Sequence, residues 1–189
     1  MKFYTNPADQ KWAVLYGSWC GSTRDASAWI SEGMGRIAAV VDVKEKPDVS
    51  AYDHIVIGSA IRAWKSTPEM QAFLQENKDL LKEKVRGFFA VCGNYGRPVG
   101  PEQVKQFIDD HMAELCGVTG AKTQVFNGRI TKSLWEPELV AGLKKQAASP
   151  ENLTPEGKPK PTLLDMPDYD KLKREECMAF GKEIFGSAG

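Results

Sequence analysis

Short apolar runs alternate with amphipathic segments along most of this sequence. The apolar runs are rich in β-branched and aromatic residues and are too short for helices, so they are predicted strands. The segments between them place apolar residues three or four positions apart, as on one face of a helix. The predicted strands are residues 12–16, 37–43, 54–58, 87–92 and 123–126. The predicted helices cover about 22–35, 68–81 and 101–115, with a last helix from about Tyr169.

Five strands that alternate with helices predict an α/β fold with three layers, in which a doubly wound parallel sheet has helices on both faces. Right-handed crossovers favour the strand order 2-1-3-4-5, and we expect one domain over residues 1–189. Residues 44–53 are too few for a crossover helix, so one turn is predicted there. Ligands of such sheets bind at the carboxyl ends of the strands, here between the first and third strands.

One long connection interrupts the alternation. Residues 128–166 join the fifth strand to the last helix, and they are longer than an ordinary loop. A short helix is predicted within 134–147, and 149–162 is predicted to be irregular because it is rich in proline. Long connections of this kind are either tolerated surface insertions or functional lids and docking elements, and the sequence leaves both open.

Charge and cysteine usage exclude several classes of protein. Lys plus Arg is 25 and Asp plus Glu is 25, so no basic excess marks a nucleic-acid binder or a polybasic membrane anchor. No integral membrane segment is expected, because the apolar stretches are only as long as strands. The four cysteines include no C-x-x-C pair, and the two histidines are too isolated for a metal site. We therefore expect reduced thiols and a cytoplasmic location.

The first strand runs directly into a loop that is rich in Gly, Ser and Thr, and a predicted helix follows. Such a loop directs backbone N–H groups and the positive end of a helix dipole at one point, which suits a phosphate. A P-loop would need a lysine after Gly21, and a dinucleotide loop would need G-x-G-x-x-G. A phosphatase loop would need an arginine six residues after its cysteine. None of these three patterns is present.

A fourth pattern fits this loop. Ser18-x-Cys20-Gly21-x-Thr23 resembles the flavodoxin sequence [ST]-x-T-G-x-T, which wraps the phosphate of FMN. The resemblance implies the flavodoxin fold and FMN as the cofactor. Cys20 departs from the pattern, because a thiol is a weaker hydrogen-bond donor than the usual threonine hydroxyl.

Flavodoxins complete the FMN site with loops after the third and fourth strands, and both loops have counterparts here. Trp64 in the first of these loops and Tyr95 in the second offer aromatic rings for stacking on the flavin. The resemblance thus implies three groups of cofactor-binding residues: Ser18, Trp19, Cys20, Gly21, Ser22 and Thr23; Ser59, Ala60, Ile61, Arg62, Ala63 and Trp64; and Cys92, Gly93, Asn94, Tyr95 and Gly96. No catalytic side chain and no metal ligand are expected.

Residues 48–62 resemble one particular branch of the flavodoxin-like proteins. The D-x-S-x-Y-D run at 48–53 and the G-S-A-I-R loop at 58–62 resemble the flavodoxin-like branch that includes menaquinone-dependent protoporphyrinogen dehydrogenase. That enzyme has a long basic insertion after its fourth strand, whereas residues 93–101 are short. The connection 128–166 has no obvious counterpart there. The porphyrin substrate is therefore not transferred to this chain.

Three functions follow from these features. The first is an FMN-binding redox protein, either an electron carrier or an oxidoreductase, whose partner is another protein, NAD(P)H or a quinone. Carrier flavodoxins tend to be acidic, so the neutral charge points to a different redox partner. The second is a monothiol redox protein that uses Cys20, because Trp19-Cys20-Gly21 resembles the thioredoxin motif. The third is an interaction module that has lost FMN. The oligomeric state leaves no signal in the sequence.

Overall fold

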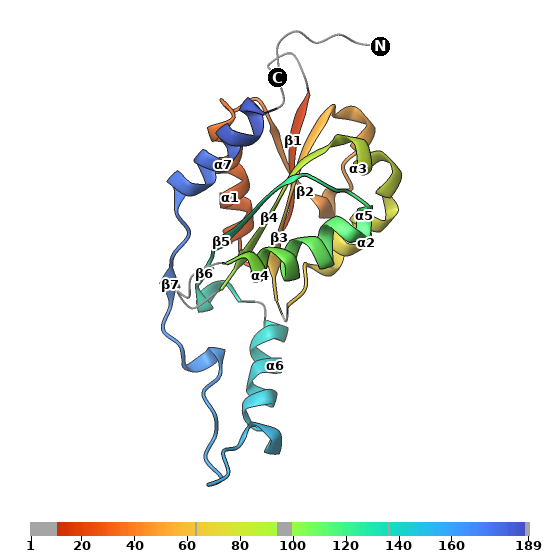
Figure 1. Ribbon diagram of the computed structural model, residues 1–189. Coiled ribbons are helices and arrows are strands. Elements are labelled where there is room, and N and C mark those ends of the chain that lie inside the picture. The colour runs from red at the N-terminus through yellow and green to blue at the C-terminus, as the bar shows by residue number, and fades with distance from the viewer. Residues whose placement is uncertain (1–10, 63, 94–99, 136, 188–189) are drawn as a thin grey trace. The chain divides into compact units, whose positions relative to one another are not determined.

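The computed structural model describes residues 11–62, 64–93, 100–135 and 137–187. The chain divides into two compact units, one formed by Met1–Gly128 with Lys171–Gly189 and the other by Arg129–Asp170. The first unit contains a five-stranded sheet with the order β2-β1-β3-β4-β5, and all four strand pairings are parallel (Figure 1). The predicted α/β fold and strand order are confirmed.

The elements of the first unit follow the predicted alternation. The strands are β1 (Trp12–Gly17), β2 (Ala39–Asp42), β3 (His54–Ile61), β4 (Val85–Cys92) and β5 (Lys122–Asn127). The helices are α1 (Ser22–Gly33), α2 (Pro68–Glu76), α3 (Lys78–Lys84), α4 (Pro101–Val104), a π-helical segment (Lys105–Ala113), α5 (Glu114–Cys116) and α7 (Arg174–Gly186). Short 3₁₀ turns occupy Val43–Glu45 and Val49–Ala51, where the sequence predicts one turn.

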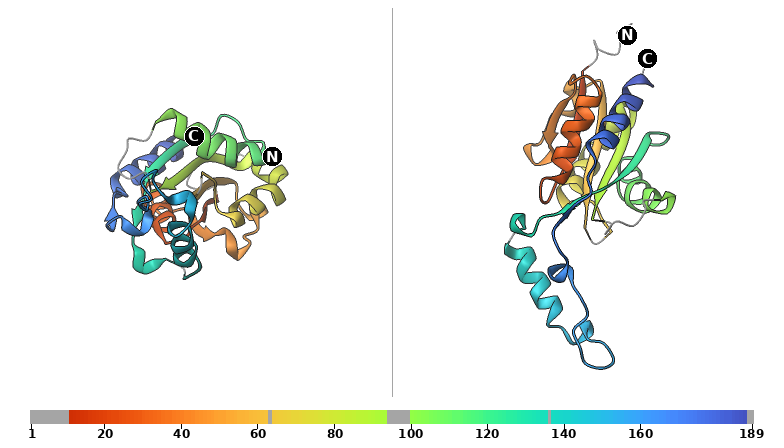
Figure 2. Two further views of the ribbon diagram at one scale, coloured as in Figure 1. Left: turned by 90° about the horizontal axis from the view of Figure 1, so that it is seen from below. Right: turned by 90° about the vertical axis from the view of Figure 1, so that its left-hand side faces the viewer.

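Helices cover both faces of the sheet, and each face has its own apolar core. Helices α1 and α7 pack on one face, whereas α2, α3 and the helical run from α4 to α5 pack on the other (Figure 2). The consecutive residues Phe88 and Phe89 are fully buried in opposite cores, because successive side chains of a strand point to opposite faces. A strand covered on both faces reads as a continuous apolar run, which explains why β4 is recognisable in the sequence.

Four predicted boundaries are wrong. Strand β3 continues to Ile61 rather than ending at residue 58, because pairing with β4 extends to its end, so three residues predicted for the following loop belong to the strand. Strand β2 begins at Ala39 rather than residue 37, after Arg36 takes a left-handed conformation with φ 63°. The predicted helix over 68–81 is two helices, because the Asn77 side chain donates to the carbonyl of Phe73 and ends α2. The last helix begins at Arg174 rather than Tyr169, because Tyr169–Asp170 forms a strand.

Helices α1 and α7 approach each other so closely that glycine is required on both. A Cβ on Gly33 would collide with the backbone carbonyl of Met178, and a Cβ on Gly181 would collide with the carbonyl of Ile30. Each glycine therefore admits the backbone of the other helix. This contact fixes the position of α1 on the sheet. Helix α1 begins directly after the loop that follows β1.

The second unit has its own small framework. Strand β6 (Arg129–Ile130) pairs antiparallel with β7 (Tyr169–Asp170), and an ion pair of 3.1 Å joins Arg129 Nε to Asp170 Oδ2. Helix α6 (Pro137–Ala147) buries Leu143, and its range agrees with the short helix predicted within 134–147. The ammonium group of Lys132 donates to the carbonyl of Leu164 at 3.2 Å. In the described part of this unit, the β6–β7 ladder, helix α6, an isolated antiparallel bridge between Leu153 and Pro159 and several polar contacts hold the chain together.

Strand β1 begins with a buried aromatic contact between Trp12 and His54. The two ring centroids are 4.5 Å apart, and both imidazole nitrogens of His54 are buried without a hydrogen-bond partner among residues 11–62, 64–93, 100–135 and 137–187. Burial lowers the pKa of His54, the nearby Arg86 lowers it further, and Asp53 opposes the shift. The neutral imidazole is therefore the form that the folded protein favours.

Acidification is expected to destabilise the protein through His54. The folded-state pKa lies below the unfolded value of about 6.5, so the unfolded chain takes up the proton more readily. The free energy of unfolding should therefore decrease as the pH falls below about 6.5 and through the lower folded pKa. Urea unfolding between pH 7.5 and 5 should show a larger loss for the wild type than for His54→Phe. Parallel pH profiles for the two proteins would contradict this account.

No helix in the described parts of the chain is both long and apolar enough to cross a membrane.

Candidate functional site

The loop between β1 and α1 forms the centre of the candidate site. The backbone N–H of Gly21 donates to Ser18 Oγ at 3.0 Å, which closes the loop into a tight turn. Gly21 has φ 86°, a left-handed conformation that favours glycine, and the amide of Asp25 donates to its carbonyl at 3.0 Å. The chain then enters α1. The predicted strand–loop–helix arrangement is present.

The amino end of α1 is open to an anion. Its cap residue is Gly21, and no described side chain caps the N–H groups of the first turn. These groups have no partner within the helix, and the helix dipole adds positive potential at the same point. Asp25 in the first turn would oppose an anion, but the guanidinium of Arg24 pairs with it at 3.2 Å.

Two buried polar atoms of this loop lack hydrogen-bond partners among the described residues. Thr23 is fully buried, yet its hydroxyl has no partner, and the indole N–H of Trp19 is also buried without one. Buried polar groups are normally bonded, so orphaned donors indicate a site that an acceptor completes. A phosphate within the loop would supply oxygen acceptors to both the hydroxyl and the open helix amides. The residues present therefore fit the phosphate group of a cofactor.

The segment after β3 packs against the end of β1. Ser59, predicted for the loop, lies within β3, is fully buried, and its hydroxyl accepts the amide of Thr67 at 3.0 Å. Thr67 caps α2 by accepting the amide of Met70, and a Cβ added to Gly17 would lie 2.5 Å from its hydroxyl. The Ser-Thr-Pro-Glu capping signal at 66–69 marks this helix start in the sequence. The signal does not indicate that Thr67 would also contact Ser59 of β3 and Gly17 of β1.

The tip of the second loop carries the arginine and tryptophan predicted for the site. Arg62 and Lys65 exchange both backbone hydrogen bonds, at 3.0 and 3.1 Å, and so form a tight turn. Trp64 in this turn has φ 68° and remains 61% exposed, and its ring lies 5.9 Å from that of Phe107. A left-handed tryptophan stores backbone strain, which is typical of functional positions. Its exposed ring is available for stacking.

The structure brings the first two predicted groups together. The guanidinium carbon of Arg62 lies 3.8 Å from the centroid of the Trp19 ring, so the loops after β1 and β3 are in contact. Ala60 is buried and Ile61 is partly buried at the end of β3, and Ser22 is buried at the start of α1. Sequence reasoning missed the Arg62–Trp19 contact, because nothing in the spacing of these residues indicates that they meet.

The third predicted group is described only in part. Cys92 is buried at the end of β4, its carbonyl accepts the amide of Gly128 at 2.7 Å, and Gly93 is partly buried. Asn94, Tyr95 and Gly96 lie outside the described residues, as does Ala63 in the second loop. The stacking role of Tyr95 stays a prediction.

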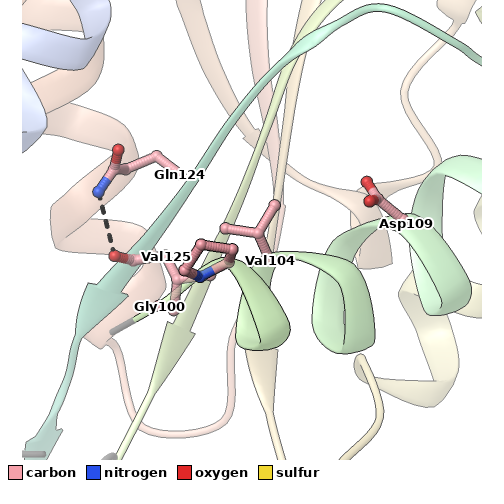
Figure 3. Close-up of a pocket in the computed structure, with 6 residues that line it drawn as sticks. Gly100, Val104, Asp109, Gln124 and Val125 are labelled. Carbon is pink, nitrogen blue, oxygen red and sulfur yellow. Dashed lines mark hydrogen bonds between the residues drawn. The ribbon is translucent and has the colours of Figure 1, made fainter. Parts of the chain in front are cut away.

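A separate hollow lies beside β5. The short helix α4 and its cap contribute Gly100, Pro101 and Val104 to the lining, and β5 contributes Gln124 and Val125 (Figure 3). The Gln124 side-chain amide donates to the Val125 carbonyl at 3.2 Å. Asp109 of the π-helical segment also lines the hollow. None of the predicted site residues that the structure describes lines this hollow, and the loop between β1 and α1 does not contribute to its described lining.

The fold and the loop define a doubly wound α/β protein whose first switch point carries a strand–loop–helix turn that fits a phosphate. The chain belongs to the flavodoxin family, because the sequence model of the flavodoxin domain matches residues 13–137. FMN is the cofactor of this family, and the match indicates that this chain binds FMN. The comparison of the sequence with curated proteins finds no match.

Several solved structures share this fold at low sequence identity. A flavodoxin from the domain Archaea is 16% identical, with 94% of this chain and 97% of that chain covered and a TM-score of 0.54. A flavodoxin, WrbA-like protein from Agrobacterium tumefaciens is 13% identical, with 95% and 97% covered and a TM-score of 0.52. Rubredoxin oxygen:oxidoreductase from Desulfovibrio gigas is 16% identical, with 96% of this chain but only 37% of that chain covered and a TM-score of 0.52.

Proposed function

We propose that this protein is an FMN-dependent redox protein whose cofactor is held by the loops after β1, β3 and β4. The observation that carries the proposal is the uncapped start of α1 beside the orphaned hydroxyl of Thr23. The first loop would take the phosphate, while Trp64 and Tyr95 would stack on the flavin ring. FMN supplies the electron chemistry when bound, and the residues of the chain hold it and exclude water.

The resemblance at residues 48–62 supports placing the chain in the branch that includes menaquinone-dependent protoporphyrinogen dehydrogenase. We do not extend that proposal to the porphyrin substrate. Flavodoxins work with redox partners, and the partner proposed here is a protein, NAD(P)H or a quinone. One domain that carries residues 128–166 as an insertion stays our prediction, as does the cytoplasmic location, which the four thiols support.

Turnover distinguishes an oxidoreductase from an electron carrier. The FMN-loaded protein should be mixed with NADH, NADPH or a reduced quinone, and the visible absorbance of the flavin should be followed in each case. Bleaching by one donor, followed by repeated turnover with an acceptor, would establish an enzyme. Stable reduction only by dithionite, with transfer to a protein acceptor, would establish a carrier. A protein that retains no flavin in any of these mixtures would contradict the proposal.

The monothiol alternative rests on the position of Cys20. This cysteine precedes α1 and is partly exposed, whereas the other three are buried. Burial raises the pKa of the Cys177 thiol to about 12 and also raises that of Cys116, so these two thiols are poor nucleophiles at neutral pH. Any thiol chemistry of this chain would therefore belong to Cys20.

Cys20→Ser distinguishes the two functions, because it should strengthen FMN binding in one case and abolish thiol activity in the other. If the loop binds phosphate, a serine hydroxyl replaces a weak donor by a better one, and the FMN dissociation constant should fall several-fold. If Cys20 is a nucleophile, the same variant should lose all disulfide-reducing activity. The comparison requires fluorescence titration with FMN and an assay with a small disulfide. Unchanged or weaker FMN binding together with lost thiol activity would favour the alternative.

A further inference from the structure

Arg62 occupies a defined position at the junction of two loops. It directly follows β3, and its backbone is fixed by both hydrogen bonds to Lys65. Its guanidinium lies over the indole of Trp19 at 3.8 Å, well within the distance of a cation–π contact. Arg62, from the loop after β3, thus places a positive charge on Trp19, from the loop between β1 and α1 (residues 18–21, called the phosphate loop below).

The charge of Arg62 lacks an acidic partner in the described parts of the chain. No carboxylate of these residues lies within ion-pairing distance of its guanidinium. Arg24 on the other side of the loop differs, because it pairs with Asp25. A guanidinium that stacks through its face keeps its N–H groups available at its edges, where they can bond an anion in a fork. Among the described residues of the site, Arg62 is therefore an uncompensated cation.

The phosphate loop has fewer strong hydrogen-bond donors than the flavodoxin pattern, and a nearby cation would compensate for them. Cys20 stands where the flavodoxin pattern has a threonine, and a thiol donates only weakly. Ser18 already accepts the amide of Gly21, which restricts the directions in which its hydroxyl can donate. A hydrogen bond from a guanidinium to a phosphate is roughly twice as strong as one between neutral groups.

We propose that Arg62, held on the face of Trp19, binds the cofactor phosphate and selects phosphorylated flavin over riboflavin. This inference rests on the proposed function, and it assigns the guanidinium of Arg62 to the part of the site that would hold the FMN phosphate. Trp19 acts as a positioning residue, since it orients the guanidinium rather than bonding the phosphate through its ring. Binding of FMN should then depend on ionic strength more strongly than binding of riboflavin does.

The test compares FMN with riboflavin in equilibrium titrations of the full chain. Arg62→Ala should weaken FMN binding by about 10- to 100-fold and riboflavin binding by less than about 3-fold. Arg62→Lys keeps the charge but loses the paired N–H donors of the guanidinium, so its FMN affinity should lie between those of the wild type and Arg62→Ala. Trp19→Leu should lower the FMN-to-riboflavin preference, and Trp19→Phe should restore part of it. The matched control is Arg36→Ala, which removes the same charge from the segment that follows the far end of α1, where Arg36 pairs with Glu32.

The outcomes separate this inference from the proposed function. A selective loss of FMN affinity in Arg62→Ala, with a weaker salt dependence, supports the assignment. An equal loss for FMN and riboflavin would place Arg62 at the flavin ring and overturn the inference while leaving FMN binding intact. Unchanged affinities would overturn it in the same way. A wild-type protein that binds neither flavin would overturn both the inference and the proposed function.

Discussion

Thr23→Val is expected to stabilise the cofactor-free protein and to weaken its binding of FMN. The hydroxyl of Thr23 is buried without a partner among the described residues, and such a group costs about 1–3 kcal/mol of stability. Valine has nearly the same shape and removes that cost, so the free energy of unfolding should rise by about 1 kcal/mol. The same change removes a donor to the phosphate, and FMN affinity should fall about 10-fold or more. Urea unfolding and FMN titration measure the two effects.

Thr67→Val is the matched control for stability. Thr67 is also buried, but its hydroxyl accepts the Met70 amide and caps α2. Loss of this cap should lower the free energy of unfolding by about 1 kcal/mol, the opposite sign to Thr23→Val. If both variants were destabilised by the same amount, the hydroxyl of Thr23 would have a partner in the cofactor-free protein, and our account of the loop would be wrong.

Gly181→Ala is expected to destabilise the protein strongly, although it adds only one methyl group. The new Cβ would collide with the carbonyl of Ile30, and backbone cannot move aside as the end of a flexible side chain can. The α1–α7 contact must open, which should lower the free energy of unfolding by about 2–3 kcal/mol. Circular dichroism during urea unfolding measures this loss.

Gly186→Ala is the control that separates the loss of the α1–α7 contact from the effect of alanine on helix propensity. Gly186 ends the same helix, and an added Cβ meets nothing within 4 Å. The substitution should be neutral or stabilising by up to about 1 kcal/mol. A loss at Gly186 as large as that at Gly181 would show that the close approach of α1 to α7 is not the cause.

The sequence sufficed for the fold because its signals were local and consistent. The central strands β1, β3 and β4 each contain an apolar run, and the crossover rules leave few strand orders. Boundaries failed where a tertiary or side-chain contact decided them. Asn77 ends α2 through its own side chain, and Tyr169 joins a strand that pairs with residues 129–130, some forty positions earlier in the chain. Neither contact is visible in a short window of sequence.

The candidate site was predicted in its loops but not in the contacts between them. The positions of Gly21 and Thr23 follow from the strand–loop–helix pattern, and the structure places them at the open start of α1. The stacking of Arg62 on Trp19 depends on two side-chain conformations that no spacing rule specifies. The same holds for the bond from the Thr67 amide to the Ser59 hydroxyl, which joins the start of α2 to β3.

FMN titration of the cofactor-free wild-type chain tests the central claim most directly. The quenching of flavin fluorescence should reach saturation at one FMN per chain, with a dissociation constant in the micromolar range or below. Gly21→Val, which forces a β-branched residue into a left-handed turn, should weaken the binding strongly while the rest of the fold is retained. Saturable one-to-one binding that depends on Gly21 is the predicted result. The absence of binding, or binding that Gly21→Val leaves unchanged, would contradict the assignment of this loop to the cofactor phosphate.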